Sequence, residues 1–269
     1  MKKIFSVEQI RRADAYTIEH TAISSIDLME KAAGECALWL KYRAAKNQEY
    51  AIFAGPGNNG GDGLAIARML HGYVLKTSST FSPDFSINLE RLEKITPVNI
   101  WEKSPNEWPE LSPNCILIDA VFGSGLSKPL TGLPLKVVNW MNSCPNVKIA
   151  IDIPTGLFAD KLISDLPENI LHADYTLSFQ FVKLAFLMPE NEFFVGEWHI
   201  LDIGLAQDFI ETEPTNTFII GREIVKRILQ KRHKFSHKGD FGHALIIAGD
   251  STKMGAGLLS SKACIKSGA

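Results

Sequence analysis

Residues 50–63 read YAIFAGPGNNGGDG, an apolar run followed by a segment in which five of nine residues are glycine. The uninterrupted apolar run Tyr50–Ala54 is typical of a strand that is buried on both faces of a sheet. The residues after it predict a helix over 63–75. A strand that passes through a glycine-rich turn into a helix is the opening unit of a parallel α/β sheet.

Strand and helix patterns alternate on both sides of this unit. A capping box at Ser6 and Gln9 predicts a helix to about His20, and a second helix is expected from Ser25. Further buried strands are predicted at residues 98–101, 115–120, 147–153 and 175–179, with a helix at 135–141. We therefore expect an α/β fold, a Rossmann-like doubly wound, mostly parallel sheet with helices on both faces.

The alternating pattern ends near Leu205, and the rest of the chain predicts further segments. The expected division is a first domain at 1–211, a linker at 212–236 and the start of another domain at 237–269. The linker is expected to contain an entry strand (218–220) and a helix (222–231). The last segment is expected to contain a strand (243–248) and a helix (257–265). The polar, acidic residues 207–217 suit a linker. The basic stretch at 231–238 is more typical of a solvated linker than of a phosphate or RNA site.

Composition excludes several classes of protein. A net charge of −2 over 269 residues gives no reason to expect nucleic acid. The four cysteines are far apart and form no C-x-x-C pair, so we expect free thiols in a reducing cytoplasm. No apolar stretch is long enough to span a membrane, and charged residues interrupt the N-terminal segment where a signal peptide would be apolar. These features predict a cytoplasmic protein.

The glycine-rich segment is the strongest chemical signal. Glycines let the backbone approach a ligand and direct several N–H groups at phosphate oxygens beside a helix N-terminus. Gly55, Gly57 and Gly60 also satisfy G-x-G-x-x-G, so a Rossmann dehydrogenase is one alternative, and a turn without a ligand is another. No acidic residue closes the next strand, which we expect to end near residues 80–82, and this counts against the dehydrogenase.

Polar side chains also follow two later strands. Asp119 ends one predicted strand and Asp152 ends the next, with Thr155 three residues further on. The carboxyl ends of parallel strands meet at one edge of the sheet, so we expect these side chains to face one crevice with Asn59. Carboxylate, amide and hydroxyl oxygens suit either a hard cation or acid–base catalysis. A cap for the turn that follows is the alternative role of Asp119.

Three motifs carry a resemblance to a known family. NNGGDG at 58–63, DAVFGSGL at 119–126 and DIPTG at 152–156 resemble the NAD(P)H-hydrate epimerases, in the same order and spacing, up to about Leu205. The resemblance implies interconversion of the R and S forms of NADH and NADPH hydrated at C6, with potassium as the cofactor. Hydrated NADH or NADPH would be the substrate, no nucleic acid or membrane partner is expected, and a homodimer is left open.

Site residues follow from the same resemblance. Asp152 would face the reacting ring as the catalytic residue, and Asn59, Asp119 and Thr155 would hold potassium, although the family commonly has serine in place of Thr155. Lys128 is the candidate basic residue of the 123–129 loop. The residues expected to contact substrate are Asn58, Asn59, Gly60, Gly61, Asp62, Gly123, Ser124, Gly125, Leu126, Ser127, Lys128, Pro129 and Asp152.

The tail carries a second resemblance. HKGDFGH at 237–243 and MGAG at 254–257 resemble the start of the ribokinase-like NAD(P)H-hydrate dehydratase domain, in which Ala256 would contact substrate. We therefore expect a bifunctional protein cut short, in which dehydration of the S form with ADP or ATP belongs only to a full-length form. A non-catalytic binding or scaffold module is the remaining alternative, and it would not need to keep both aspartates, the asparagines and the glycine-rich turn.

Overall fold

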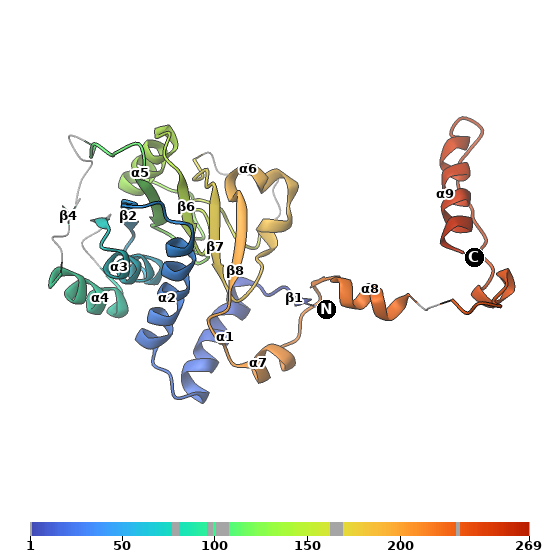
Figure 1. The fold of residues 1–269 in the computed structure, drawn as a ribbon, viewed down its shortest axis with the longest axis horizontal. Coiled ribbons are helices and arrows are strands. Elements are labelled where there is room, and N and C mark those ends of the chain that lie inside the picture. Colours follow the sequence, from blue (N-terminus) through green and yellow to red (C-terminus); the bar gives the residue numbers. More distant parts are fainter. Residues whose placement is uncertain are drawn as a thin grey trace. The chain divides into compact units, whose positions relative to one another are not determined.

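The computed structural model describes residues 2–76, 81–95, 99–100, 108–161, 169–229 and 232–268. They form two compact units, Lys2–Ile219 and Ile220–Ala269. Figure 1 shows the first unit as a sheet with helices packed against it. All four cysteines are free, as expected.

The sheet of the first unit is parallel throughout. In the described part of the chain it has seven strands in the order β4-β3-β2-β5-β6-β7-β8, and each neighbouring pair is parallel. The strands are β2 (Tyr50–Ala54), β3 (Tyr73–Lys76), β4 (Asn99–Ile100), β5 (Ile116–Ala120), β6 (Lys148–Ile151), β7 (Tyr175–Phe179) and β8 (Glu197–Leu201). The strand order reverses direction between β2 and β5, which is where doubly wound sheets bind ligands. The predicted fold class is confirmed.

Helices connect and flank these strands. They are α1 (Val7–His20), α2 (Ser25–Arg43), α3 (Asn58–Leu70), α4 (Pro83–Glu93), α5 (Gly132–Ser143), α6 (Glu192–Val195) and α7 (Gln207–Thr212), with 3-10 turns η1 (Leu184–Leu187) and η2 (Pro189–Asn191). The predicted capping box is present, because the Gln9 amide donates to Ser6 Oγ and the Ser6 amide donates to Gln9 Oε1.

Both faces of the sheet are covered. Ile52 and Ala54 of β2 pack in a core with residues of α2, α3 and α4, while Ala51 and Phe53 pack with residues of α5. Because side chains alternate between faces along a strand, a strand covered on both sides must be apolar at every position. This explains the uniform apolar run of β2, where burial of each large side chain contributes about 1.5–3 kcal/mol.

Two elements near the glycine-rich segment differ from the prediction. The helix begins at Asn58 and ends at Leu70, where 63–75 was expected, and β3 begins at Tyr73; residues 77–80, just before the expected strand end, lie outside the described residues. His71 adopts a left-handed backbone (φ 54°) and its amide closes the helix on Ala67 O. A Cβ atom at Gly72 would lie 2.3 Å from Ile52 Cδ1, so Gly72 lets the chain turn closely past β2. The apolar residues at 73–75 are compatible with a continued helix or with a strand. The turn at His71 and Gly72 ends the helix, so these residues form the strand.

The other predicted strand boundaries lie close to the observed ones. The strand predicted at 98–101 is present at Asn99–Ile100, and its two flanking residues lie outside the described residues. Helix α4 and the edge strand β8 were not predicted, and β8 carries Glu197 and His199 in place of an apolar run. Edge strands are paired on one side only and tolerate such residues.

The chain termini of the first unit are joined. Strand β1 (Lys2–Lys3) pairs antiparallel with β9 (Phe218–Ile219), and the Ile4 amide donates to Thr217 O at 3.0 Å. Helix α7 occupies part of the segment predicted as a linker. The compact unit therefore extends past residue 211, where the sequence predicts the end of the first domain.

The second unit contains α8 (Arg222–Ile228), the 3-10 turn η3 (Lys238–Phe241) and α9 (Met254–Ser267). Helix α8 ends before the predicted boundary at 231, and residues 230–231 lie outside the described residues. The predicted strand at 243–248 is wrong, because the described residues of this unit offer no other strand to pair with it. Helix α9 contains the predicted helix at 257–265, with Ala256 in its first turn, and leaves Leu258, Leu259 and Ile265 exposed. Among the described residues, no helix is both long and apolar enough to cross a bilayer.

Candidate active site

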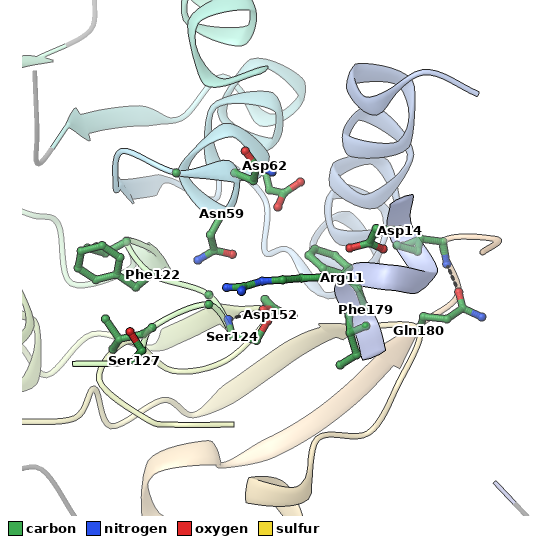
Figure 2. A pocket seen from close by; sticks show the side chains of 18 of the residues that line it. Arg11, Asp14, Asn59, Asp62, Phe122, Ser124, Ser127, Asp152, Phe179 and Gln180 are labelled. Atoms are coloured by element: carbon green, nitrogen blue, oxygen red, sulfur yellow. Dashed lines mark hydrogen bonds between the residues drawn. The ribbon is translucent and has the colours of Figure 1, made fainter. Parts of the chain in front are cut away.

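A cavity of about 530 Å³ lies where the strand order reverses (Figure 2). The carboxyl ends of β2, β5, β6 and β7 lead into its walls, and α1 supplies a further wall. Its lining residues are Ile10, Arg11, Asp14, Gly57, Asn58, Asn59, Asp62, Val121, Phe122, Gly123, Ser124, Gly125, Leu126, Ser127, Lys128, Asp152, Phe179, Gln180, Ile203 and Leu205. Ten of the thirteen residues predicted to contact substrate are among them. Gly60, Gly61 and Pro129 are not.

Close backbone packing explains the glycine-rich turn. A Cβ atom at Gly55 would lie 1.7 Å from the carbonyl oxygen of Val121, and one at Gly60 would lie 1.8 Å from the carbonyl oxygen of Gly55. A Cβ atom at Gly61 would lie 2.7 Å from Met29 Sδ. Gly60 and Gly61 are thus packed against the protein interior, and they shape the turn that presents its neighbours to the cavity.

Asp152 is held in a single position at the end of β6. Its backbone is left-handed (φ 69°), and its amide donates to Leu177 O at 2.7 Å. The Ser124 amide donates to Asp152 Oδ2 at 2.7 Å, and Lys183 Nζ lies 2.6 Å from Asp152 Oδ1. Burial alone would raise the pKa of Asp152, but the charge and hydrogen bond of Lys183 and the hydrogen bonds of Ser124 outweigh it and hold the pKa below its ordinary value. Asp152 is therefore an ionised carboxylate that lines the cavity.

Lys183 is a functional residue that sequence reasoning missed. It directly precedes η1, its side chain is 1% exposed, and it also donates to Ser178 Oγ on β7. A buried ammonium is costly unless it is paired and hydrogen-bonded. The available signal was a lone lysine inside the apolar stretch Phe181–Leu187, a few residues after a predicted strand.

Asp119 and Thr155 lie beneath the cavity, which corrects the expectation that they face it. They are 0% and 1% exposed, and neither lines the cavity. The Thr155 amide and hydroxyl donate to the Asp119 carboxylate at 2.8 and 2.7 Å, and the Val121 amide donates to it at 3.1 Å. Burial raises the pKa of Asp119 to about 6, against the opposing effect of these hydrogen bonds.

Asn59 connects the cavity to this buried pair. Both its amide oxygen and its amide nitrogen are buried without a hydrogen-bond partner. A Cβ atom at Gly123 would lie 3.3 Å from Asn59 Cγ, and the neighbouring Phe122 amide donates to Thr155 Oγ1 at 3.0 Å. Asn59, Asp119 and Thr155 therefore gather around the backbone of residues 121–123. Buried polar groups are nearly always satisfied, so the unpartnered Asn59 oxygen fits a hard cation at this place.

The residues around this cavity fit a transition metal less well than a hard cation. Among the residues that the structure describes, no group of three His, Cys, Asp or Glu side chains is arranged to hold a metal ion. The oxygen donors around residues 121–123 include one carboxylate, an amide and a hydroxyl. Such a donor set suits a hard cation of low charge better than zinc or copper.

Helix α1 contributes cavity residues that no motif indicated. Arg11 crosses the 123–128 loop, where its Nη2 lies 2.8 Å from the position of a Cβ atom at Gly125 (Figure 2). Asp14, on the same helix, is half-buried in the cavity wall. Burial and the negative charge of Asp152 raise the pKa of Asp14 to about 7, while Lys183 opposes them. Burial, followed by the charges of Asp152 and Asp14, also raises the pKa of Asp62 well above its ordinary value.

Gln180 completes the cavity on the β7 side. Its side-chain oxygen accepts from the amides of Ile203 and Gly204 at 3.0 and 3.2 Å. This contact secures the segment after β8, so that Ile203 and Leu205 line the cavity. Gln180 follows a predicted strand, so the rule that ligands bind at strand ends could have indicated it.

Comparisons with known proteins agree with this architecture. A family model described as YjeF-related protein N-terminus matches residues 25–185. The bifunctional NAD(P)H-hydrate repair enzyme Nnr of Thermofilum pendens is 33% identical over 99% of this chain and 52% of its own length. The NAD(P)H-hydrate epimerase of Oenococcus oeni is 33% identical over 75% of this chain and 97% of its own length. The chain thus spans about half the length of the bifunctional relative.

A solved structure shares the fold. The crystal structure of yeast ynu0, YNL200c, superimposes with a TM-score of 0.65 at 22% identity, covering 80% of this chain and 96% of the yeast chain. The family match contains the glycine-rich turn, the 121–128 loop, Asp152 and Lys183, while α1 lies before it. On the family model and the Oenococcus relative together, this chain belongs to the family described as YjeF-related protein N-terminus.

Proposed function

We propose that this chain interconverts the R and S forms of NADH and NADPH hydrated at C6 of the nicotinamide ring. The observation that carries the proposal is the carboxyl group of Asp152, held by Lys183 and the Ser124 amide in a cavity beside a glycine-rich turn. The name of the Oenococcus relative, NAD(P)H-hydrate epimerase, supports the same reaction.

The cavity walls supply groups for both parts of such a substrate. Gly57 caps the N-terminus of α3, where free backbone amides and the helix dipole favour the phosphate oxygens of a dinucleotide. Lys128 and the loop residues Gly123–Ser127 line the same space and would enclose the rest of the molecule. The hydrated ring would then lie over Asp152.

The chemistry at C6 requires proton transfer. This carbon carries a hydroxyl and a ring nitrogen, so either the C–O bond or the ring C–N bond can break with help from the nitrogen lone pair. Inversion follows when the group is added again from the other face. Asp152 would act as a base in this proton transfer, and its fixed position would keep it in reach of an oxygen on its face of C6.

Asn59, Asp119 and Thr155 would hold potassium. Bound there, the ion would offset the negative charge of Asp119 and give the Asn59 oxygen the partner that it lacks. The three residues all contact the 121–123 backbone, so they would order the loop that presents Gly123 and Ser124 to the cavity.

A direct assay tests the proposed function. The protein is given purified R-hydrate of NADH, and formation of the S-hydrate is followed by chromatography. We expect conversion well above the rate measured without protein, and the same equilibrium mixture when the reaction starts from the S-hydrate. Equal rates with and without protein would contradict the proposal.

A further inference from the structure

A second carboxylate reaches the cavity from a different element. Asp14 projects from α1 toward the cavity, whereas Asp152 follows β6 (Figure 2). A ring bound between these two walls would present one face to each carboxyl group. The proposed reaction inverts a carbon that must lose and regain oxygen on opposite faces.

The surroundings of the two carboxyl groups differ. Asp152 is paired with Lys183 and accepts from the Ser124 amide. Asp14 makes no hydrogen bond or ion pair with any residue that the structure describes, although it is half-buried. A carboxyl group that is partly removed from water and makes no hydrogen bond or ion pair favours its neutral, protonated form.

Other charged groups also surround the cavity, but none of them forms an ion pair with Asp14 in the described part of the chain. Besides Asp152 and Lys183, the charged or titratable residues around the cavity are Asp62 and Lys128 from other elements, and Arg11, which precedes Asp14 by three residues on α1. Lys183 directly pairs with Asp152, and Asp62 adds a further carboxyl group to the same space. Burial and the charge of Asp152 raise the pKa of Asp14 to about 7, against the opposing charge of Lys183, so the group is about half protonated near neutral pH.

We propose that Asp14 is the second proton-transfer residue of the site and acts on the face of C6 opposite to Asp152. This inference rests on the proposed function. Pairs of titratable groups whose environments separate their protonation states are the usual basis for assigning an acid and a base. Here Asp14 is the acid and Asp152 is the base.

The step balances without a further reactant. Asp14 donates its proton to the C6 hydroxyl as the C6–O bond breaks, the nitrogen lone pair forms a C=N bond, and water leaves. Water then adds to C6 from the face of Asp152, which accepts the proton as the new C6–O bond forms and the electron pair returns to nitrogen. The pair still holds one proton, which returns from Asp152 to Asp14 by exchange with solvent.

The test compares Asp14→Asn with the wild-type protein and with Glu19→Gln. Glu19 lies on the same helix, outside the cavity, and controls for loss of a negative charge from α1. We expect Asp14→Asn to lower kcat for epimerisation by about 10²-fold or more with little change in KM, because general acid catalysis typically contributes this much. Glu19→Gln should keep wild-type turnover, and Asp14→Glu should recover part of the loss.

The pH profile distinguishes proton transfer from a structural role. Wild-type kcat should fall as the pH rises through the titration of Asp14, from either epimer, because the pair then loses its one proton. Asp14→Asn should lack this fall. Because the unfolded chain ionises Asp14 at a lower pH than the folded chain, the folded protein loses stability over that interval. Asp14→Asn removes this loss, so its Tm at pH 8 should equal or exceed that of the wild type.

Each result supports or overturns the inference. Wild-type turnover by Asp14→Asn, or an unchanged alkaline fall in kcat in that variant, overturns the role of Asp14 while leaving the proposed function intact. A wild-type protein that does not epimerise the hydrate refutes the proposed function, and the role of Asp14 with it. The inference is supported if Asp14→Asn has a lower kcat, no longer shows the alkaline fall in kcat, and keeps full thermal stability.

Discussion

At the scale of single residues, the Asp152–Lys183 pair is the buried ion pair at the wall of the cavity. Lys183 is buried and needs Asp152 as its counterion, and Asp152 needs Lys183 to remain ionised away from water. Breaking a buried pair by removing one partner typically costs about 3–5 kcal/mol, because the other charge is left uncompensated. The two residues should therefore affect stability and activity in separable ways.

Asp152→Asn should lower the rate of epimerisation by about 10²–10⁴-fold, since it keeps the shape of the side chain and removes the base. It should also lower the free energy of unfolding, because Lys183 loses its counterion. The double variant Asp152→Asn with Lys183→Met should regain much of that stability without regaining activity. Denaturant unfolding and the chromatographic assay, applied to the wild type and to both variants, measure both effects. Near wild-type turnover by Asp152→Asn would refute its role as the base.

Lys183→Met alone should shift the pH dependence of activity. Lys183 lowers the pKa of Asp152, so its removal raises that pKa. A base must be ionised, so activity is lost as the pH falls through its pKa, and in the variant this loss should occur at a higher pH. The stability due to the pair follows the same sign: it is present above the ordinary pKa of 3.8 and is lost as the pH falls through the lower folded-state value. An acid limb at the wild-type position would contradict the role of Lys183 in lowering the pKa of Asp152.

Asn59 offers a test of the cation that does not depend on activity. Potassium should raise the Tm of the wild-type protein relative to choline at equal ionic strength, because a ligand that binds only the folded state stabilises it. Asn59→Ala should abolish this increment, while Asn58→Ala, the exposed neighbour, should keep it. The wild type with rubidium should also show an anomalous difference peak between Asn59, Asp119 and Thr155. A wild-type Tm that is the same in both salts would contradict the proposed site.

At the scale of elements, the packing of the glycine-rich turn against the neighbouring loops determines the cavity wall. A Cβ atom at Gly60 would collide with the carbonyl oxygen of Gly55, which belongs to the backbone and cannot move aside cheaply. Gly60→Ala should therefore cost about 1–3 kcal/mol of unfolding free energy, as overpacking of a core typically does. It should also reduce epimerisation, because the turn before α3 must shift.

Gly34→Ala is the matched control for that substitution. Gly34 lies inside α2, and a Cβ atom there would meet nothing within 4 Å. Replacing an unconstrained helical glycine by alanine should stabilise the protein by about 0.5–1 kcal/mol. Chemical denaturation of the two variants should give shifts of opposite sign. Equal stability of Gly60→Ala and the wild type would show that the turn has room to adjust.

At the scale of the whole molecule, residues 213–219 close the first unit. Lys3 Nζ donates to Glu213 O at 2.7 Å, Gln9 Nε2 donates to Pro214 O at 2.7 Å, and Thr215 Oγ1 donates to Ile4 O at 2.9 Å. The β1–β9 pairing adds to these contacts. Each such hydrogen bond contributes on the order of 1 kcal/mol. These contacts also hold the start of α1, the helix that carries Arg11 and Asp14.

A protein that ends at Ile219 should therefore unfold at the temperature of the first unit in the full chain. A protein that ends at Glu211 should unfold at a lower temperature, by several degrees, because it loses all of these contacts. Calorimetry of the two shortened proteins and the full chain measures this difference. Equal unfolding temperatures for the two would place the functional boundary at 211, as the sequence alone predicts.

The sequence by itself determined the fold class and one half of the site. Apolar runs alternating with helical patterns predicted a doubly wound parallel sheet, and the motifs after β2, β5 and β6 predicted which strand ends meet. These predictions succeed because they depend on local rules: a glycine where the backbone approaches closely, and a polar side chain where a strand ends. The helix predicted at 63–75 is present, but the prediction carried it too far, into β3, because apolar residues at short spacing suit a helix or a strand equally well.

Only the tertiary structure decided the other half of the site. Asp14 enters the cavity because α1 packs beside a sheet edge formed far along the chain, and Lys183 pairs with Asp152 because β7 lies next to β6. Asp119 lies below the cavity floor, where its carboxylate accepts hydrogen bonds from Thr155 and Val121. A local sequence pattern does not predict these contacts, because burial and charge pairing depend on which segments the completed fold brings together.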